Sequence, residues 1–152
     1  MSSLLERYPF KNRPFLHQAA YLERFWEYAQ VALFAEMGTG KSFMLINNAA
    51  LLYDQGKIDA LLIVAPKGVY RNWYTSELPK HMPDHVNYKM ACWSPSPRKA
   101  ERAQMDEMIN HLDGLRILIM NVEAFSTEKG QSFARTRSEE HTSELQSLRH
   151  LV

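Results

Sequence analysis

The stretch Val31-Ala-Leu-Phe-Ala-Glu-Met-Gly-Thr-Gly-Lys-Ser42 decides the fold, because it joins a short apolar run to a loop with two glycines. Val31 to Ala35 has the length and composition of a buried strand. The residues from Ser42 to about Gln55 are apolar nearly all round, which predicts a buried helix that ends at Gly56. A strand, a glycine-bearing loop and a helix in this order predict a phosphate-binding loop.

Outside this stretch, apolar strands and helical segments alternate along the chain. Further strands are predicted at 60–65, 86–92 and 115–120, and Pro66 ends the first of them. Helices are predicted at 18–29, 69–78, 98–112 and 123–134, and the second of these ends before Pro79. This alternation predicts an α/β fold with a parallel sheet and helices on both faces, and such sheets bind ligands at the carboxyl ends of their strands.

The composition is that of one folded domain. The chain has 152 residues, of which 45% are hydrophobic, and a formal net charge of +1. These values exclude a disordered, collagen-like or disulfide-stapled chain and a basic nucleic-acid tail, but they allow a local basic groove. The lone Cys92 fits a reducing compartment. Because no apolar run is long enough for a bilayer and the first residues form no signal peptide, we expect a soluble cytoplasmic protein without a membrane partner.

The last residues differ from the rest of the chain. Residues 137–147 read Arg-Ser-Glu-Glu-His-Thr-Ser-Glu-Leu-Gln-Ser, a polar string without a period. This string resembles the translation of a common short-read sequencing adapter in one frame, and 150–152 resemble its continuation after a barcode. We therefore divide the chain into native residues 1–136 and a non-native tail at 137–152, and we expect the natural reading frame to be cut at this junction. A solvated polar tail is the alternative.

Each residue type in the glycine-bearing loop suits a phosphate group. The backbone N–H groups that can turn toward the β-phosphate of a nucleotide belong to Met37, Gly38, Thr39 and Gly40. Lys41 supplies a charge for the β- and γ-phosphates and is the candidate catalytic residue, and the Ser42 hydroxyl can ligate Mg²⁺. The general motif has glycine where Ala35 stands. The alternative is a glycine-rich turn that is followed by Lys-Ser by chance.

The residues around this loop resemble a helicase family. Ala35-Glu-Met-Gly-Thr-Gly-Lys-Ser42 resembles the first motif of the Swi/Snf-like ATPases of helicase superfamily 2, which usually reads Asp-Glu-Met-Gly-Leu-Gly-Lys-Thr. The chain departs from that motif at Ala35, Thr39 and Ser42, and Ser42 keeps the hydroxyl. Upstream, Arg13-Pro-Phe-Leu-His-Gln18 resembles the adenine-reading segment of the family, in which Gln18 would use both amide groups on the adenine edge, with Phe15 nearby. The alternative for Gln18 is a surface residue that opens a helix.

Two further segments resemble the DNA-contacting motifs of the family. Leu62-Ile-Val-Ala-Pro-Lys-Gly-Val-Tyr-Arg-Asn-Trp73 has the strand, the proline and the Asn-Trp pair, but Gly68 replaces a common serine. This resemblance implies that Lys67, the Gly68 backbone and Arg71 hold nucleic-acid phosphates. We interpret Trp73 as a core residue, because tryptophan is more often buried in a core than in contact with a ligand. Ile117-Leu-Ile-Met-Asn-Val-Glu123 resembles a later motif that prefers Thr-Tyr-Glu. It implies a DNA contact for Asn121, and a plain strand end is the alternative.

The resemblance covers residues 10–134 and implies the first part of a RecA-like P-loop NTPase domain, which binds ATP and Mg²⁺ and moves along double-stranded DNA. The Asp-Glu pair and the second-domain arginines of the family are not identifiable here, so we expect this chain alone to be inactive and its sheet to have an open edge. The alternatives are another P-loop motor, such as a strand-separating helicase or a restriction-system translocase, and a non-catalytic nucleotide-binding or structural module. The sequence indicates neither the biological process nor the oligomeric state.

Two smaller patterns have structural interpretations. His81 and His85 have a metal-ligand spacing, but Pro83 lies between them, so we expect ordinary surface histidines. One face of the helix predicted at 98–112 is apolar and is expected to pack in the core, as is Cys92; this face carries Met105, Met108, Ile109 and Leu112.

Overall fold

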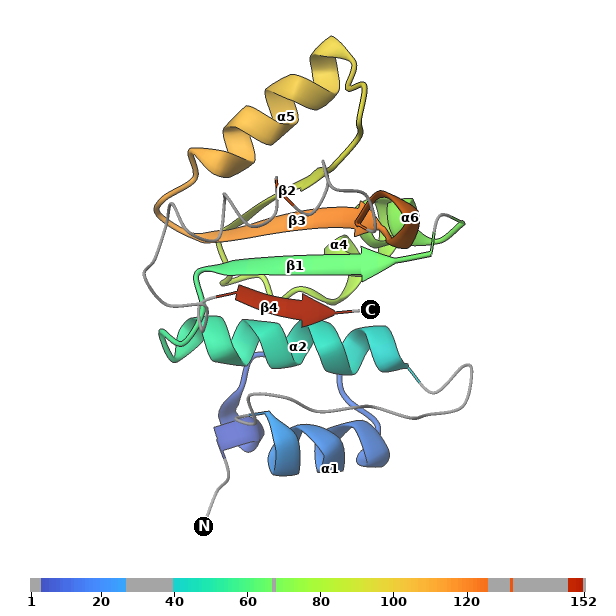
Figure 1. Ribbon diagram of the computed structural model, residues 1–152. Coiled ribbons are helices and arrows are strands. Elements are labelled where there is room, and N and C mark those ends of the chain that lie inside the picture. The colour runs from blue at the N-terminus through green and yellow to red at the C-terminus, as the bar shows by residue number, and fades with distance from the viewer. Residues whose placement is uncertain (1–3, 27–39, 67, 126–131, 133–147, 152) are drawn as a thin grey trace.

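The computed structural model describes residues 4–26, 40–66, 68–125, 132 and 148–151. The predicted strand at 31–35, the loop residues Met37, Gly38 and Thr39, and Lys67 lie outside the described residues. The helices are η1 (3-10, Leu4–Arg7), α1 (Leu16–Phe25), α2 (Lys41–Asp54), α3 (Tyr70–Asn72), η2 (π, Trp73–Glu77), α4 (Leu78–His81), α5 (Lys99–Ile109) and α6 (Val122–Phe125). The strands are β1 (Ala60–Ala65), β2 (Tyr88–Cys92), β3 (Leu115–Asn121) and β4 (Leu148–Leu151), as Figure 1 shows. No described helix is long and apolar enough to cross a membrane.

The strands form one parallel sheet in the order β2-β3-β1-β4. The two inner strands β1 and β3 are buried over nearly their whole length, which is why their sequences are continuous apolar runs rather than alternating ones. Ala65 at the end of β1 lies opposite Asn121 at the end of β3. The predicted α/β class with a parallel sheet is therefore confirmed.

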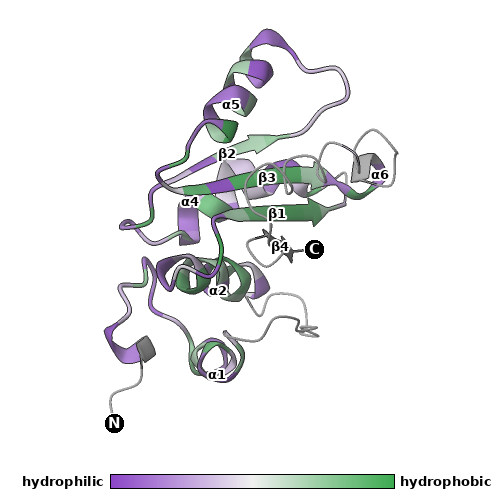
Figure 2. Ribbon diagram, turned by 60° about the vertical axis from the view of Figure 1, so that its left-hand side comes forward, coloured by the Kyte–Doolittle hydropathy of each residue, from purple (hydrophilic) through white to green (hydrophobic). Residues whose placement is uncertain are grey.

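Helices cover both faces of the sheet, and Figure 2 shows that the hydrophobic residues concentrate on β1, β3 and α2. One face carries Leu61, Ile63 and Ile117 and packs against α2, α3 and α4. The opposite face carries Leu62 and packs against Met108 of α5. Successive residues of a strand point to opposite faces, so β1 contributes alternately to both clusters.

Helix α2 runs antiparallel to β1, so its first residue lies at the same end of the molecule as the carboxyl ends of the strands (Figure 1). Helix α1 packs on the side of α2 that faces away from the sheet, through a cluster that includes Leu22, Phe43 and Met44. The Asn48 amide of α2 also donates a hydrogen bond to the Trp26 carbonyl oxygen at the end of α1, at 2.7 Å. The chain thus has an additional helical layer outside α2.

The helical segment after β1 differs from the prediction. It continues through Pro79 to His81 instead of ending before the proline, because the turn at Trp73–Glu77 is π-helical. There the Leu78 N–H donates to the Trp73 carbonyl oxygen, five residues back. Proline has no N–H to donate, and the wider turn lets the helix pass Pro79 without the clash that proline makes in a regular α-helix. The expected packing role of Trp73 is confirmed, since it is buried.

Several element boundaries also move. Helix α1 ends at Phe25 instead of Ala29, and β2 begins at Tyr88 instead of Val86. Helix α5 ends at Ile109, so Leu112 lies beyond it and is 71% exposed, contrary to the predicted apolar face. Met105, Met108 and Ile109 do pack against the sheet. Helix α6 (Val122–Phe125) begins one residue before the helix predicted at 123–134, and in the rest of that predicted helix the structure describes Ser132 alone.

Strand β4 comes from the segment at 137–152 that the sequence analysis sets apart. It pairs in parallel with β1, with Leu148 opposite Ala60 and Leu151 opposite Ile63. The outer edge of β1 is therefore paired over this length, where we expected an open edge. Extended backbone of many sequences can satisfy the N–H and C=O groups of an edge strand, so this pairing does not depend on a native sequence. The adapter origin of the tail stays a prediction.

Candidate nucleotide and nucleic-acid site

Gly40, Lys41 and Ser42 form the start of α2. Gly40 precedes the helix in the left-handed conformation, with φ 77° and ψ 40°. Its carbonyl oxygen accepts an intrahelical hydrogen bond from the Met44 N–H at 3.3 Å. The N–H groups of a first helical turn have no partner within the helix, and the helix dipole adds partial positive charge there. This end of α2 therefore favours an anion.

Two observations favour glycine at position 40. A residue with a side chain is strained in the left-handed conformation. A Cβ atom on Gly40 would also collide with Nε2 of Gln18. The absence of a side chain at Gly40 thus lets the Gln18 amide lie close to the backbone at the start of α2.

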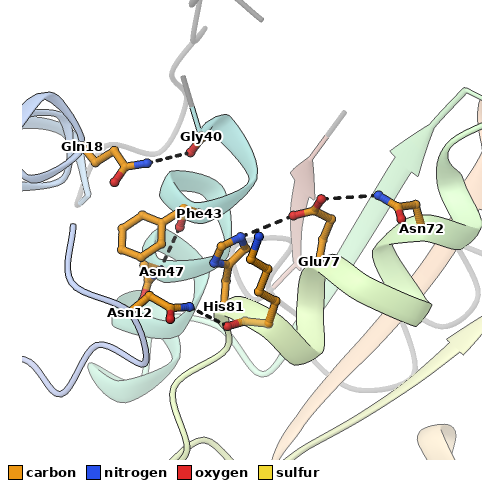
Figure 3. Close-up of polar contacts among 9 residues, drawn as sticks. Asn12, Gln18, Gly40, Phe43, Asn47, Asn72, Glu77 and His81 are labelled. Carbon is orange, nitrogen blue, oxygen red and sulfur yellow. Dashed lines mark hydrogen bonds and ion pairs between the residues drawn. The ribbon is translucent and has the colours of Figure 1, made fainter. Parts of the chain in front are cut away.

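Gln18 lies against Gly40, although 22 residues separate the two in the sequence (Figure 3). Its Nε2 donates to the Gly40 carbonyl oxygen at 3.4 Å, and its Oε1 accepts from the Phe15 N–H at 2.8 Å. The second contact is half of a capping box and fixes the side chain at the start of α1. Gln18 does open a helix, but it is 4% exposed and so is not a surface residue. Its adenine-reading role stays a prediction, and the 69% exposed ring of Phe15 lies close to it in the chain.

Lys41 and Ser42 are the first two residues of α2, and both are partly buried. Within the part of the chain that the structure describes, no hydrogen bond or ion pair occupies the Lys41 amine or the Ser42 hydroxyl. An ammonium group and a hydroxyl at a helix start suit a phosphate group and its Mg²⁺ ion, respectively. Both side chains are thus available for the predicted roles.

Three of the residues predicted to contact DNA lie where the parallel strands end, at the carboxyl edge of the sheet. Asn121 is the last residue of β3, which neighbours β1. Gly68 and Arg71 follow β1 and are exposed. The Arg71 guanidinium lies 5.3 Å from the centroid of the Tyr70 ring, and Tyr70 itself is buried. The structure therefore brings Gly68, Arg71 and Asn121 to the edge at which α2 also begins.

The charge of Arg71 affects the pKa of the Cys92 thiol. Cys92 ends β2, and burial raises the pKa of its thiol to about 11. The positive charge of Arg71 opposes this rise, and the negative charge of Glu101 adds to it. Arg71 thus acts on the carboxyl end of β2 as well as on its own strand end. A thiol with this pKa is a poor nucleophile at neutral pH, which agrees with a structural role for Cys92.

Among the described residues, no cluster of acidic side chains lies at the start of α2. Among them, no group of three or more His, Cys, Asp and Glu side chains could hold a metal ion. The adjacent acids Asp106 and Glu107 lie on the exposed side of α5, where Glu107 pairs with Lys89 at 2.9 Å. The Mg²⁺-ligand role of Ser42 stays a prediction.

The sequence analysis missed polar contacts beside this site. The His81 side chain, expected at the surface, is only 13% exposed, and burial lowers its pKa. Its Nε2 lies 3.4 Å from Oε2 of Glu77, and its ring packs edge-on against Phe43 with 5.5 Å between ring centroids. The signal was the i, i+4 spacing of Glu77 and His81. It was not recognised, because the predicted helix ended at Leu78. His85 is more exposed and pairs with Asp54 at 2.7 Å.

No protein-family model matches the sequence, and no curated protein is significantly similar to it. The functional interpretation therefore depends on the residues and their geometry.

Proposed function

We propose that this chain is the ATP-binding part of a DNA-dependent ATPase similar to the Swi/Snf-like enzymes, with a RecA-like P-loop NTPase fold, which couples ATP hydrolysis to movement along double-stranded DNA. One observation carries the proposal. The left-handed Gly40, followed by Lys41 and Ser42, begins a buried helix at the carboxyl edge of a parallel sheet. At this edge α/β sheets bind ligands, and a helix start there favours phosphate.

The residues at this edge fit ATP with Mg²⁺. Lys41 would hold the β- and γ-phosphates, Ser42 would ligate the metal, and Gln18 would contact the adenine. The backbone N–H groups that would line the β-phosphate are those of Met37, Gly38, Thr39 and Gly40. When bound, the metal ion neutralises phosphate charge. The contribution of the chain is to supply the Lys41 charge and a backbone without a side chain at Gly40.

The same edge suits a nucleic-acid backbone. Lys67, the Gly68 backbone, Arg71 and Asn121 would contact DNA phosphates, and the exposure of Gly68 and Arg71 supports this role. Phosphate contacts carry no sequence information, so we expect binding to duplexes of many sequences. We propose that the protein acts on DNA in the cytoplasm of a bacterial or phage-infected cell.

Binding and turnover require different groups. Phosphoryl transfer requires a carboxylate that helps to hold Mg²⁺, a group that orients the attacking water, and an arginine that meets the developing charge. The described residues offer no acidic cluster for the first of these roles. We therefore propose that the described part of this chain binds MgATP without hydrolysing it.

Titration calorimetry with MgATP tests the proposal. We expect the wild-type chain to give a heat of binding and the Lys41→Ala variant to lose it, with an unchanged circular dichroism spectrum. Lys57→Ala is the matched control, because this exposed lysine follows the opposite end of α2. A folded wild-type chain that gives no heat with MgATP would overturn the proposal.

Fluorescence anisotropy separates the proposal from a strand-separating helicase and from a non-catalytic nucleotide-binding module. A preference for a labelled duplex over the corresponding single strand supports a double-strand translocase. A preference for the single strand favours a strand-separating helicase, and MgATP binding without any DNA binding favours a nucleotide-binding module.

A further inference from the structure

A series of side-chain contacts joins the exposed segment after β1 to the first turn of α2 (Figure 3). The Asn72 amide donates a hydrogen bond to Oε1 of Glu77 at 3.4 Å. The other carboxylate oxygen of Glu77 lies 3.4 Å from Nε2 of His81. Glu77 therefore uses one oxygen for each neighbour. Asn72 directly follows Arg71, one of the proposed DNA contacts.

His81 carries the series onward to α2. Its ring meets the Phe43 ring edge-on, with centroids 5.5 Å apart and an interplanar angle of 86°. Phe43 is 3% exposed and is the third residue of α2. The N–H groups of Lys41, Ser42 and Phe43 belong to the turn that would face the phosphates. The position of the Phe43 ring therefore affects the position of these donors.

The proton on the His81 ring can be assigned from its surroundings. Burial lowers the pKa of His81 below its ordinary value of 6.5, so the ring is neutral at pH 7, although Glu77 acts in the opposite direction. Nδ1 is buried with no hydrogen-bond partner among the described residues. Only an N–H can donate to a carboxylate, so the proton belongs on Nε2. Glu77 consequently faces two donors, one from Asn72 and one from His81.

The end of α4 is held from outside, which keeps this series of contacts in place. The Lys11 amine donates to the Pro79 carbonyl oxygen and the Asn12 amide to the Lys80 carbonyl oxygen, both at 2.8 Å. The Phe10 ring stacks on the Phe43 ring with centroids 5.9 Å apart. Residues 10–12 thus contact both α4 and Phe43 and hold the end of α4 beside α2.

We propose that Glu77 is a positioning residue that couples DNA contact at residues 68–72 to MgATP binding at the start of α2. This inference rests on the proposed function. Contact of DNA with Arg71 would order Asn72 and Glu77, and through His81 it would fix the first turn of α2. Coupling between two binding sites is reciprocal, so a duplex that orders this series should tighten MgATP binding.

The test measures the coupling directly. The dissociation constant of MgATP is determined by calorimetry with and without a saturating short DNA duplex, for the wild type and for Glu77→Gln. Glutamine has nearly the same shape, but its side chain has only one acceptor oxygen for the two donors. We expect the duplex to tighten MgATP binding to the wild type about fivefold or more. We expect Glu77→Gln to bind MgATP alone like the wild type and to lose about two- to tenfold of the coupling.

Two more variants keep the test decisive. Asn72→Ala changes an exposed residue, removes only the first contact of the series and should also reduce the coupling. Glu107→Gln removes an acid of the same kind from the Lys89 ion pair on α5 and should retain the full coupling.

Each outcome has one meaning. Full coupling in Glu77→Gln, or in Asn72→Ala if the first variant does not fold, overturns the inference. A wild-type chain that binds MgATP and duplex independently also overturns it, while the proposed function stands. A folded wild-type chain that binds no MgATP overturns the proposed function itself.

Discussion

The Nε2 atom of Gln18 lies 3.4 Å from the carbonyl oxygen of Gly40 and joins the first turn of α1 to the residue that begins α2. This contact connects the residue proposed for adenine with the residue that shapes the phosphate end of the site. Gln18 is buried, and a Cβ atom on Gly40 would fit only if the Gln18 amide moved. A change at either residue therefore alters both ends of the proposed nucleotide site.

Gly40→Ala is expected to destabilise the protein. Alanine in the left-handed conformation costs about 1–2 kcal/mol, and its Cβ atom would displace the Gln18 amide. Urea unfolding measures the loss. Gly68→Ala is the matched control, because Gly68 has no left-handed φ and nothing lies within 4 Å of a Cβ placed there. The control should stay within about 0.5 kcal/mol of the wild type. Equal stabilities of the two variants would contradict the role given to Gly40.

Gln18→Ala is expected to lower the stability of the fold and the preference for adenine over guanine nucleotides. It leaves the Phe15 N–H and the Gly40 carbonyl oxygen without this partner, at a cost of about 1–3 kcal/mol. It also removes the amide proposed to read adenine. Calorimetry with MgATP and MgGTP should show an ATP preference in the wild type that the variant loses. Gln55→Ala, at the opposite end of α2, should keep the preference. An ATP preference retained by Gln18→Ala would exclude the adenine role.

The central elements of the fold were predictable because their apolar residues and the residues that end them are compatible with few secondary structures. A continuous apolar run that stops at Pro66 fits a strand buried on both faces, and an all-round apolar segment that stops at Gly56 fits the buried helix α2. The alternation of strands and helices predicts a parallel sheet, in which β1 and β3 end at the same edge. The structure confirms that Gly68 and Asn121 lie at this edge.

Apart from the shifted element boundaries, the errors depend on contacts between distant segments or on an unusual turn. A π-helical turn has no signature in hydrophobic periodicity, so the passage of the helix through Pro79 was not predicted. The burial of His81 comes from packing against Phe43, which lies far from it in the sequence. The contact between Gln18 and Gly40 likewise depends on how α1 packs on α2. Single-sequence patterns do not contain these pairings.

His81→Gln is expected to reduce the loss of folding stability that occurs as the pH falls from about 7 to about 5. Burial lowers the pKa of His81 in the folded state below 6.5, so the unfolded state takes up its proton at higher pH than the folded state. This group therefore makes stability fall as the pH drops from about 6.5 toward the folded pKa. Urea midpoints between about pH 7 and pH 5 should fall less in the variant than in the wild type. His17→Gln makes the same change at an exposed position of α1 and is the matched control. An unchanged slope in His81→Gln would contradict the burial of this ring.

Arg71→Gln is expected to slow the alkylation of Cys92. The pKa of this thiol is raised to about 11 by burial, against the charge of Arg71. The iodoacetamide reaction should therefore be slow at neutral pH and accelerate toward about pH 11. Loss of the guanidinium removes an opposing charge, so the pH-rate curve should move to higher pH. Arg24→Gln, an exposed arginine of α1, should leave the curve in place. The same curve for wild type and Arg71→Gln would show that Arg71 does not face the end of β2.

Gly68→Ser is expected to strengthen duplex binding. The motif that this segment resembles has a serine here, and a side chain at this position meets nothing within 4 Å. A hydroxyl beside Arg71 would add one hydrogen bond to a phosphate, which corresponds to about a two- to tenfold gain in affinity. Anisotropy with a labelled duplex at several salt concentrations measures both the affinity and its salt dependence.

The salt dependence separates a hydroxyl contact from a charge contact. Serine is neutral and releases no counterion, so the slope of log affinity against log salt should match the wild type in Gly68→Ser. Arg71→Gln should instead weaken binding and reduce that slope by about one. Weaker binding in Arg71→Gln with no gain in Gly68→Ser would mean that the segment meets DNA through the guanidinium and not through position 68. No change in either variant would place the DNA contact away from these two positions, because Arg71 and Gly68 are both exposed and would then both be irrelevant to binding.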